Sequence, residues 1–366
     1  MNTHVTVLEI DGNALKHNLA YYKQRLQPET EICAVVKAFG YGSDAVAIAT
    51  TLASEVACFA VAYTQEGVAL RAAGIQKPIL VLHPQIANFA TLIQQELTPC
   101  LFSFKSVTAF KELLQKNNRT AYPVHLKFNT GLNRIGFLKK DIPALLTQLN
   151  TGTILTVTGV FSHLAASDDL EEVAFTTQQI TAFNSILDSI LPQLKSKPVV
   201  HLLNSSGALN YPEAQYNMVR IGIGLYGFSS DITNTTPLKN VSSLRTVISQ
   251  IHQLEAGESV GYNRGFIASK KIKSATLPIG HADGISRQLG NGKGYVRIQN
   301  QKAPILGNVC MDMVMVDISD IDCQEGDEAV FFDSQEMLQE MADTCQTIPY
   351  EILTAISQRV QRVLKY

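Results

Sequence analysis

Short apolar runs alternate with amphipathic segments through the first two thirds of the chain. Each run is apolar along nearly its whole length, which is typical of strands buried on both faces of a parallel sheet. The expected strands are Ile32–Lys37, Cys58–Ala62, Ile79–Leu82, Pro99–Phe102, Val124–Phe128, Val157–Phe161, Val199–Leu203 and Met218–Ile221. Segments with apolar residues at helical spacing lie between most of them: Ala45–Ala53, Glu66–Ala72, Val107–Gln115, Ile142–Leu149 and Phe175–Leu191.

This alternation predicts an α/β fold. Eight strands within about 220 residues favour a closed (β/α)₈ barrel, the TIM barrel, which usually has about this length. An open doubly wound sheet is the alternative. Its dinucleotide-binding form is disfavoured because no Gly-x-Gly-x-x-Gly motif follows the first expected strand.

The composition changes after Gly227, and the 366 residues leave room for a second domain. Ser229–Thr236 is rich in Ser, Thr, Asn and Asp, which is typical of a linker. Beyond it, Leu244–Ile251, Ile272–Leu277, Gly294–Ile298 and Met313–Ile318 favour strands, and Ser334–Ala342 and Tyr350–Val363 favour helices. We therefore expect a barrel at residues 11–233 and a mostly β C-terminal domain at 234–366. We expect an N-terminal strand at residues 1–10 to pack with the C-terminal domain.

Composition excludes several classes of protein. Hydrophobic residues make up 46% of the chain and charged residues 17%, which favours a large packed core over disorder. The net charge of -2, without a basic tract, argues against a nucleic-acid or anionic-membrane partner. No apolar run is long enough to cross a bilayer, and the N-terminus lacks the pattern of a signal peptide. The six cysteines form no Cys-x-x-Cys pair, so we expect a reduced, cytoplasmic protein.

Lys37 ends the first expected strand and is followed by glycines around a tyrosine, in Gly40-Tyr41-Gly42. A lysine that ends a buried strand loses solvation, which lowers its pKa and favours the neutral, nucleophilic amine. Such an amine can form a Schiff base with a carbonyl compound or with pyridoxal phosphate. The alternative is a lysine that simply reaches into solvent.

Further polar residues occupy the expected C-terminal strand ends, where TIM barrels carry their active sites. They are Lys127 and Arg134 at and beyond the fifth strand, His163 after the sixth, Asn204 and Ser205 after the seventh, and Arg220 and Gly222 at the eighth. Loops after the last two strands commonly hold a phosphate. Ser205 can donate a hydroxyl group, and Gly222 lets the backbone approach an anion. A lysine nucleophile beside a phosphate site is what pyridoxal 5′-phosphate needs.

Each of these residues also has a purely structural alternative. His163 could be a hydrogen-bonded core histidine, and Arg134 a surface residue of its loop. Asn204 and Ser205 could cap the helix that follows them. Their joint occurrence at matching strand ends favours one common site.

The second domain contributes two candidate segments. Tyr262 lies in a glycine-flanked turn, Ser259–Arg264, and Gly307–Met313 precedes an expected strand. A lone tyrosine of this kind is more often a packing or rim aromatic. Cys310 has no nearby partner that would make it a metal ligand or a thiolate nucleophile.

Taken together, these motifs resemble those of the alanine racemases, a family of fold-type III pyridoxal-phosphate enzymes. The resemblance extends from about Leu8 to Val363, and the order and separation of the motifs agree as well. The motifs are Val35-Val36-Lys37-Ala38 with Tyr41-Gly42, Lys127-Phe128-Asn129-Thr130-Gly131 with Arg134, Asn204-Ser205, Val219-Arg220-Ile221-Gly222, Val260-Gly261-Tyr262 and Val309-Cys310-Met311-Asp312.

The resemblance implies a barrel followed by a β-rich domain, in a head-to-tail homodimer with shared active sites. It implies pyridoxal 5′-phosphate as cofactor and a small amino acid as substrate. Lys37 would bind the cofactor covalently and act as one catalytic base, and Tyr262 would act as the other. The remaining cofactor-binding residues would be Tyr41, His163, Asn204, Ser205, Arg220, Gly222 and Ile223.

The resemblance also implies that Arg134 and Met311 contact the substrate, with Lys127, Cys310 and Asp312 in support. Lys127 matches a lysine that is often carbamylated in the family. Tyr262 and the segment Cys310–Asp312 would reach the site from the partner subunit.

Three residues depart from the common family pattern. His281 and Gln358 stand where tyrosine is usual, and Asn308 stands where arginine is common. We expect them to affect substrate preference rather than the two bases.

The expected function is therefore alanine racemisation, which supplies D-alanine for peptidoglycan. The alternatives are a broader racemase of small amino acids such as serine and a noncatalytic pyridoxal-phosphate-binding protein. A related decarboxylase is disfavoured by Arg220, because decarboxylation gains from a protonated pyridine nitrogen.

Overall fold

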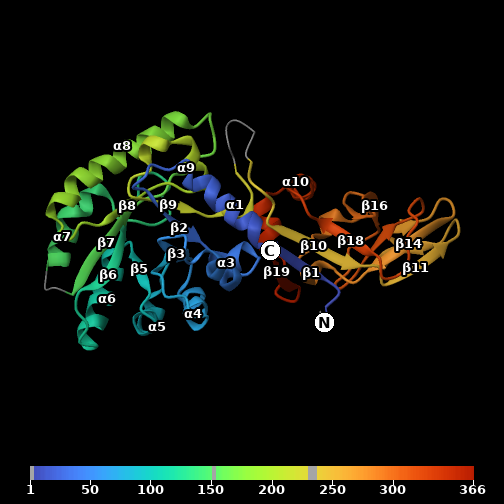
Figure 1. Ribbon diagram of the computed structural model, residues 1–366, viewed down its shortest axis with the longest axis horizontal. Helices are drawn as coiled ribbons and strands as arrows, with labels where there is room; N and C mark the ends of the chain where they lie inside the picture. Colours follow the sequence, from blue (N-terminus) through green and yellow to red (C-terminus); the bar gives the residue numbers. More distant parts are fainter. Residues whose placement is uncertain (1–3, 151–153, 230–236) are drawn as a thin grey trace.

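Eight parallel strands form a closed barrel in the N-terminal part of the chain, and a β-rich domain lies beside it (Figure 1). The structure is a computed structural model that describes residues 4–150, 154–229 and 237–366. The barrel strands are β2 (Glu31–Val35), β3 (Cys58–Val61), β4 (Ile79–Val81), β5 (Thr98–Leu101), β6 (Tyr122–Lys127), β7 (Leu155–Phe161), β8 (Val199–His201) and β9 (Met218–Ile221). β2 pairs in parallel with both β3 and β9, which closes the barrel. The predicted fold class is confirmed.

Helices cover the outside of the barrel (Figure 1). They are α1 (Gly12–Lys23), α3 (Ala45–Leu52), α4 (Thr64–Ala72), α5 (Phe89–Gln94), α6 (Phe104–Lys116), α7 (Ile142–Asn150), α8 (Val173–Ile190) and α9 (Ser205–Asn210). Side chains fix several of their starts: the Asp44 carboxylate accepts hydrogen bonds from the backbone of Val46 and Ala47, which caps α3. Across the described residues, none of the helices combines the length and apolarity that crossing a membrane requires.

The second domain is built on a nine-stranded sheet in the order β11-β14-β17-β16-β15-β18-β10-β1-β19. Its strands are β1 (Val7–Asp11), β10 (Ser242–Val247), β11 (Gln250–Leu254), β14 (Ile272–Leu277), β15 (Tyr295–Ile298), β16 (Gln301–Leu306), β17 (Val314–Asp317), β18 (Glu328–Phe332) and β19 (Gln361–Lys365). A small pair, β12 (Ser259–Val260) and β13 (Phe266–Ile267), and two helices, α10 (Gln335–Thr344) and α11 (Pro349–Ala355), complete it.

The first strand of the chain belongs to this C-terminal sheet. β1 pairs antiparallel with β10 and parallel with β19, and its residues Leu8 and Ile10 are fully buried. The chain therefore begins in the β-rich domain, forms the barrel, and then returns to the same sheet. Apart from Ser229, the expected linker Ser229–Thr236 lies outside the described residues, as does the expected boundary at 233/234.

The structure corrects two expected elements of the second domain. Tyr350–Val363 is not one helix, because α11 ends at Ala355 and residues 361–365 form β19. Pairing with β1 decides the conformation of that segment, and local propensity does not. Leu244–Ile251 is not one strand either: Ile248 donates its N–H to Asp327 O outside the ladder, which separates β10 from β11.

The two domains meet where the loop after β2 touches the segment after α11. The guanidinium of Arg362 donates hydrogen bonds to Gly42 O (2.7 Å) and Ser43 O (3.0 Å) on the barrel side. The same group donates to Ile356 O (2.7 Å) and Val360 O (2.6 Å) in the C-terminal domain. One side chain thus satisfies carbonyls from both domains.

Candidate active site

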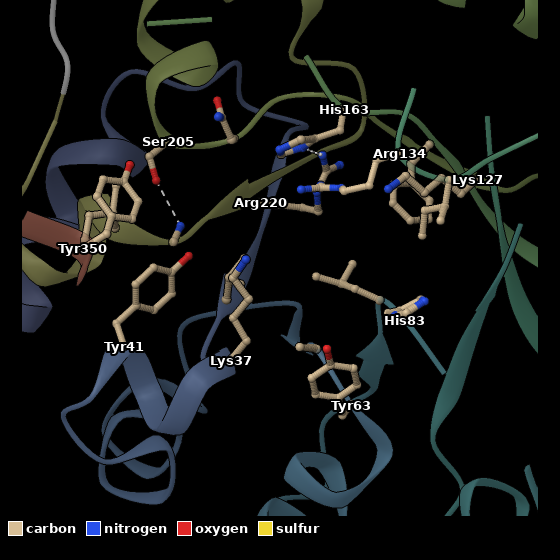
Figure 2. A pocket seen from close by; sticks show the side chains of 18 residues that line it. Lys37, Tyr41, Tyr63, His83, Lys127, Arg134, His163, Ser205, Arg220 and Tyr350 are labelled. Atoms are coloured by element: carbon tan, nitrogen blue, oxygen red, sulfur yellow. Dashed lines mark hydrogen bonds between the residues drawn. The ribbon is translucent and has the colours of Figure 1, made fainter. Parts of the chain in front are cut away.

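A cavity of about 540 Å³ opens at the C-terminal ends of the barrel strands (Figure 2). It is lined by Val35, Lys37, Tyr41, Ala62, Tyr63, Leu82, His83, Lys127, Arg134, Ile135, Phe161, His163, Asn204, Ser205, Arg220, Gly222, Ile223 and Tyr350. All the barrel residues predicted for the site are among them. In Figure 2, Lys37 lies between a group formed by Tyr41, Ser205 and Tyr350 and a second group formed by Arg134, Lys127 and His83.

A left-handed turn directly follows Lys37 and places its side chain in this pocket. Lys37 does not end the first barrel strand as expected, because β2 stops at Val35 and Lys37 begins the short helical element α2 (Lys37–Tyr41). The φ angles of Ala38, Phe39, Gly40 and Tyr41 are 54°, 56°, 63° and 51°. L-residues adopt this conformation at a cost of roughly 1–2 kcal/mol each. The Glu66 carboxylate helps to hold the turn, since it accepts the Ala38 N–H at 2.6 Å.

The surroundings of Lys37 favour its neutral amine. Burial is the main cause that lowers its pKa, and the positive charge of Arg134 lowers it further. Arg220 acts in the same direction, whereas the Glu66 carboxylate opposes the shift. A neutral amine in a half-buried pocket is the nucleophilic form of lysine.

The loops after β8 and β9 form a cradle at one end of the pocket. The hydroxyl oxygen of Ser205 accepts hydrogen bonds from Gly222 N (3.0 Å) and Gly224 N (3.2 Å), so its own hydrogen can be donated to a ligand. A Cβ at position 222 would lie 2.3 Å from the hydroxyl oxygen of Tyr41. Only glycine therefore fits beside Tyr41. Burial raises the pKa of Tyr41, which keeps its hydroxyl neutral and able to donate.

Asn204 has the structural role that the sequence left open as its alternative. Its Oδ1 accepts the Gly207 N–H at 2.8 Å and thereby caps α9, and it also accepts the Ser167 hydroxyl at 2.9 Å. Asn204 lines the pocket at the same time. It therefore orients the helix that begins with Ser205.

Arg220 is a buried cation surrounded by neutral acceptors. It is 4% exposed, and no carboxylate of the described residues forms a salt bridge with it. Its Nη1 donates to His201 Nδ1 (2.8 Å), and its Nη2 donates to His163 Nδ1 (3.0 Å) and Leu202 O (2.7 Å). Burial lowers its pKa to about 10, so the guanidinium stays charged at neutral pH.

Lys127 lies deep on the opposite side of the pocket. Burial lowers its pKa to about 8, opposed by Cys100, and the positive charges of Arg134 and Arg220 add to the lowering. Its Nζ lies 5.7 Å from the centroid of the Phe161 ring. Lys127 can therefore exchange between charged and neutral forms near physiological pH.

The predicted residues of the second domain are not brought to this pocket within one chain. Tyr262 begins the 3₁₀ turn η6 (Tyr262–Arg264) and is 74% exposed. Cys310 O accepts the His281 N–H at 2.9 Å, and Asn308 donates from Nδ2 to Tyr262 O at 3.2 Å. Tyr262, Cys310, Met311 and Asp312 therefore lie on the C-terminal domain with His281 and Asn308, away from Lys37.

Comparison with known proteins identifies the family. The family described as "Alanine racemase, N-terminal domain" matches residues 10–230, and "Alanine racemase, C-terminal domain" matches residues 241–364. The chain belongs to the alanine racemase family. The predicted family is thus confirmed, and the predicted enzyme class and cofactor, a pyridoxal-phosphate-dependent racemase, are those of the family.

Relatives and solved structures match along nearly the whole chain. The alanine racemase of Treponema denticola is 35% identical over 377 residues, which cover 99% of this chain and 98% of the relative. The alanine racemase structure from Clostridium difficile superimposes with a TM-score of 0.94 at 32% identity and covers 100% of this chain and 97% of its own. The structure from Bartonella henselae, described with covalently bound pyridoxal phosphate, gives a TM-score of 0.87 at 30% identity and covers 99% and 100%.

The pocket of this alanine racemase family member fits pyridoxal phosphate. The amine of Lys37 can bind an aldehyde, and the hydroxyls of Ser205 and Tyr41 can donate to a phosphate. Gly222 packs so closely against Tyr41 that a Cβ at this position would clash with the Tyr41 hydroxyl group. Arg220 adds a further donor, because no hydrogen bond among the described residues uses its Nε–H.

Sequence reasoning missed several residues of this racemase pocket. Tyr63, His83 and Tyr350 line it, and the ring of Tyr350 lies 6.2 Å from that of Tyr41. Tyr350 comes from α11, so it reaches the barrel only through packing of the two domains, and no local pattern indicates this. Gln358, which was expected to affect substrate preference, is exposed and does not line this cavity.

Proposed function

We propose that this protein is an alanine racemase that interconverts L-alanine and D-alanine by a two-base mechanism. One observation carries the proposal: an amine with a lowered pKa, Lys37, shares a pocket with a phosphate cradle formed by Ser205, Gly222 and Tyr41. The names of the relatives supply the substrate. Because proton removal on one face and return on the other requires a base on each face, a second base is needed besides Lys37.

Pyridoxal phosphate, when bound, supplies an electron sink for the α-carbon of an amino acid. The Lys37 amine would hold the cofactor and would take or return the α-proton on one face of the substrate. Ser205 and Tyr41 would hold the phosphate end, together with the backbone at Gly222 and Ile223. Arg220 would hold the ring nitrogen of the cofactor and, as an arginine, would not give up a proton to it. His163 accepts from Arg220 and fixes its position.

We infer that the second base is Tyr262 of a partner subunit in a homodimer. Tyr262 is 74% exposed, and the neighbouring Met311 and Met313 are 57% and 49% exposed. Apolar side chains gathered on one surface are typical of an interface. The segment Cys310–Asp312 lies on the same surface, so the same partner contact would bring Met311 to the substrate.

Mixing two inactive variants tests the shared site. Lys37→Ala and Tyr262→Phe each remove one base, and a mixed dimer contains one site with both bases intact. Random mixing of equal amounts should restore up to about a quarter of the parent activity, since half of the dimers are mixed and each has one complete site. No recovery above the sum of the separate variants would refute the shared site.

The link between Lys37 and the cofactor is tested by absorbance. We expect Lys37→Ala to lose the visible band of the lysine-bound cofactor, with exposed Lys116→Ala as a control that keeps it. An unchanged spectrum in Lys37→Ala would refute the assignment.

Tyr262→Phe should slow proton removal from one enantiomer far more than from the other, and an equal small effect would contradict the two-base scheme.

We infer that Arg134 binds the substrate carboxylate and that Lys127 supports it. Both line the pocket, and the pKa of about 8 gives Lys127 a sizeable neutral fraction. A neutral amine is the form that adds carbon dioxide to give a carbamate, with release of one proton. A ¹³C signal of a carbamate in protein exposed to ¹³C-bicarbonate, absent from Lys127→Met, tests this; its absence from the parent would refute carbamylation.

Substrate choice is tested by comparing turnover of L-alanine and L-serine. Faster L-serine turnover would replace the proposal by the broader racemase, and no turnover of any small amino acid would favour a noncatalytic cofactor-binding protein.

The proposed cellular role is supply of D-alanine for peptidoglycan in the cytoplasm. Expression in a bacterium that requires added D-alanine should remove that requirement, and the Lys37→Ala variant should not.

A further inference from the structure

Two histidines inside the barrel lie between Arg220 and the N-terminal ends of the strands. His201, at the end of β8, accepts the Nη1–H of Arg220 at its Nδ1. Its other nitrogen, Nε2, lies 3.0 Å from Nδ1 of His125 on β6. His201 is fully buried and His125 is nine-tenths buried. The three side chains form a hydrogen-bonded chain that leads from the active-site pocket toward the opposite end of the barrel.

The direction of every bond in this chain follows from Arg220. A guanidinium has donors and no acceptor, so Nδ1 of His201 must be unprotonated. In a neutral ring the proton is then on Nε2, which donates to Nδ1 of His125. By the same reasoning, the proton of His125 is on its own Nε2. One obligate donor therefore fixes the tautomers of both histidines.

Both histidines are held neutral by their surroundings. Burial is the main cause that lowers the pKa of His125 to about 4, and the charge of Arg220 adds to it. The pKa of His201 is lowered well below its usual range by the same two causes. A proton on either ring would place a second cation beside a buried guanidinium that has no carboxylate partner among the described residues.

The barrel is shaped around these two rings. The ring of Phe161 stacks on His201 with centroids 4.5 Å apart and planes 8° apart, which fixes the plane of His201. Position 159 on β7 is glycine, and a Cβ there would lie 2.4 Å from Cε1 of His125. Gly159 therefore leaves space for the ring of His125, and stacking on Phe161 fixes the ring of His201.

The His125 end of this series of hydrogen bonds reaches a second cavity, of about 590 Å³. Its lining includes residues at the N-terminal ends of the barrel strands: Glu31, Cys58, Thr98, Tyr122, Val199 and Met218. His125 also lines it, and no hydrogen bond among the described residues uses His125 Nε2. Water in this cavity can accept the last donor, so no member of the chain of bonds is left unsatisfied.

We propose that His201 and His125 are positioning residues that hold the Arg220 guanidinium in one orientation toward the cofactor ring while leaving its charge unpaired. The proposal rests on the proposed function, because it names a task for Arg220 in that reaction. A carboxylate beneath Arg220 would also orient it, but it would neutralise the charge. A neutral imidazole accepts the hydrogen bond and leaves the full positive charge to act on the ring nitrogen.

The first test is independent of activity and measures the tautomers. Protein labelled with ¹⁵N-histidine, without cofactor, should show His201 and His125 as neutral rings with protonated Nε2 and unprotonated Nδ1 between about pH 6 and 8. Signals are assigned by their loss in His201→Asn and His125→Asn. A protonated Nδ1 on either ring, or a doubly protonated ring, would overturn the proposal.

The second test uses His125, which does not touch the cofactor pocket. His125→Asn keeps an acceptor near the position of Nδ1, whereas His125→Leu removes it and leaves the Nε2–H of His201 unpaired. We expect His125→Leu to lower kcat by about tenfold with KM changed less than about twofold, and His125→Asn to stay within about threefold of the parent. The exposed His252 on β11 provides a control, His252→Leu, that should match the parent.

The visible band of the bound cofactor gives a further readout. It should shift in His125→Leu and return toward the parent position in His125→Asn, which a loss of stability alone would not produce. Equal behaviour of the two variants in kcat and in the spectrum would overturn the proposal. If His125→Leu fails to fold, the tautomers of the parent and the kcat of His125→Asn still decide. If the parent itself racemises nothing, the proposed function fails, while the nitrogen signals still report on the chain of bonds.

Discussion

At the scale of single residues, one oxygen atom restricts position 222 to glycine. The φ of Gly222, -110°, lies outside the left-handed region, and a steric restriction acts at this position. It comes from the Tyr41 hydroxyl oxygen, which lies 2.3 Å from where a Cβ would be. The next atom, Cζ of Tyr41, would be 3.2 Å away. The phosphate cradle therefore depends on a contact between the loop after β2 and the loop after β9.

We expect Gly222→Ala to lower the free energy of unfolding by about 1–3 kcal/mol and the affinity for pyridoxal phosphate by about tenfold. Adding Tyr41→Phe should recover part of the stability, because the clashing oxygen is gone, but not the affinity, because a phosphate donor is lost. Thermal unfolding of the apoprotein and titration with pyridoxal phosphate measure the two effects. The exposed Lys116→Ala is the control, and no recovery in the double variant would contradict the steric account.

Lys127 should make stability depend on pH. Its pKa is lowered in the folded protein to about 8 from 10.5, so between these values the unfolded chain binds more protons than the folded one. The free energy of unfolding should therefore rise with pH through this window, by up to about 1.4 kcal/mol per pH unit. Well below pH 8 the lysine is charged in both states, and the full cost of burying the charge remains.

The variant Lys127→Met isolates this effect. Its advantage in melting temperature over the parent should be largest near pH 7 and should shrink as the pH rises toward about 10, in buffer free of carbon dioxide. The exposed Lys116→Met provides the control and should show no such trend. A constant difference between Lys127→Met and the parent would contradict the lowered pKa.

At the scale of elements, the left-handed turn α2 needs support from outside the barrel. Arg362 provides it, since its guanidinium binds Gly42 O and Ser43 O as well as Ile356 O and Val360 O. Arg362→Ala would leave these carbonyls without their donor. We expect a loss of about 2–4 kcal/mol in the free energy of unfolding and faster amide exchange in residues 38–43.

Arg362→Lys separates charge from geometry. One ammonium group cannot reach all of these carbonyls. Arg362→Lys should therefore retain less than half of the stability that Arg362→Ala loses. Arg119→Ala, at an exposed position, is the matched control. If Arg362→Lys were as stable as the parent, the forked geometry of the guanidinium would not matter.

The sequence predicts the elements whose pattern is local and misses those that depend on partners. Barrel strands are buried on both faces, so each is an apolar run, and all of them are predicted. β16, β18 and β19 are not, and the segment of β19 is predicted as helix because only its pairing with β1 makes Gln361–Lys365 extended. Likewise, the site residues at strand ends are predicted, whereas Tyr350 and the turn geometry of Lys37 arise from contacts distant in sequence.

At the scale of the whole molecule, the barrel and the β-rich domain lie side by side in an elongated chain (Figure 1). The Lys37 pocket belongs to the barrel, and the exposed Tyr262 belongs to the other domain. A head-to-tail pair of chains can bring each Tyr262 to the pocket of its partner. The elongated shape is thus compatible with the proposed dimer.

The outer strand β19 should be essential for the C-terminal sheet. Deleting residues 361–366 removes the parallel partner of β1 and the hydrogen bonds of Arg362. We expect the melting temperature to fall by about 10 °C or more, or the protein to lose its soluble fold. Deleting Tyr366 alone, which leaves β19 intact, should cost much less. Melting followed by circular dichroism compares the two, and an unchanged melting temperature after the longer deletion would contradict this role.

The shared sheet of β1 and β19 has a consequence for biosynthesis. A ribosome makes β1 early, but its partners β10 and β19 emerge only after the whole barrel, and β19 follows β10. Until then, the apolar side chains of Leu8 and Ile10 have no sheet to cover them. The nascent chain can complete its barrel first, but Leu8 and Ile10 stay exposed, and in need of protection from aggregation, until residues 361–365 have left the ribosome.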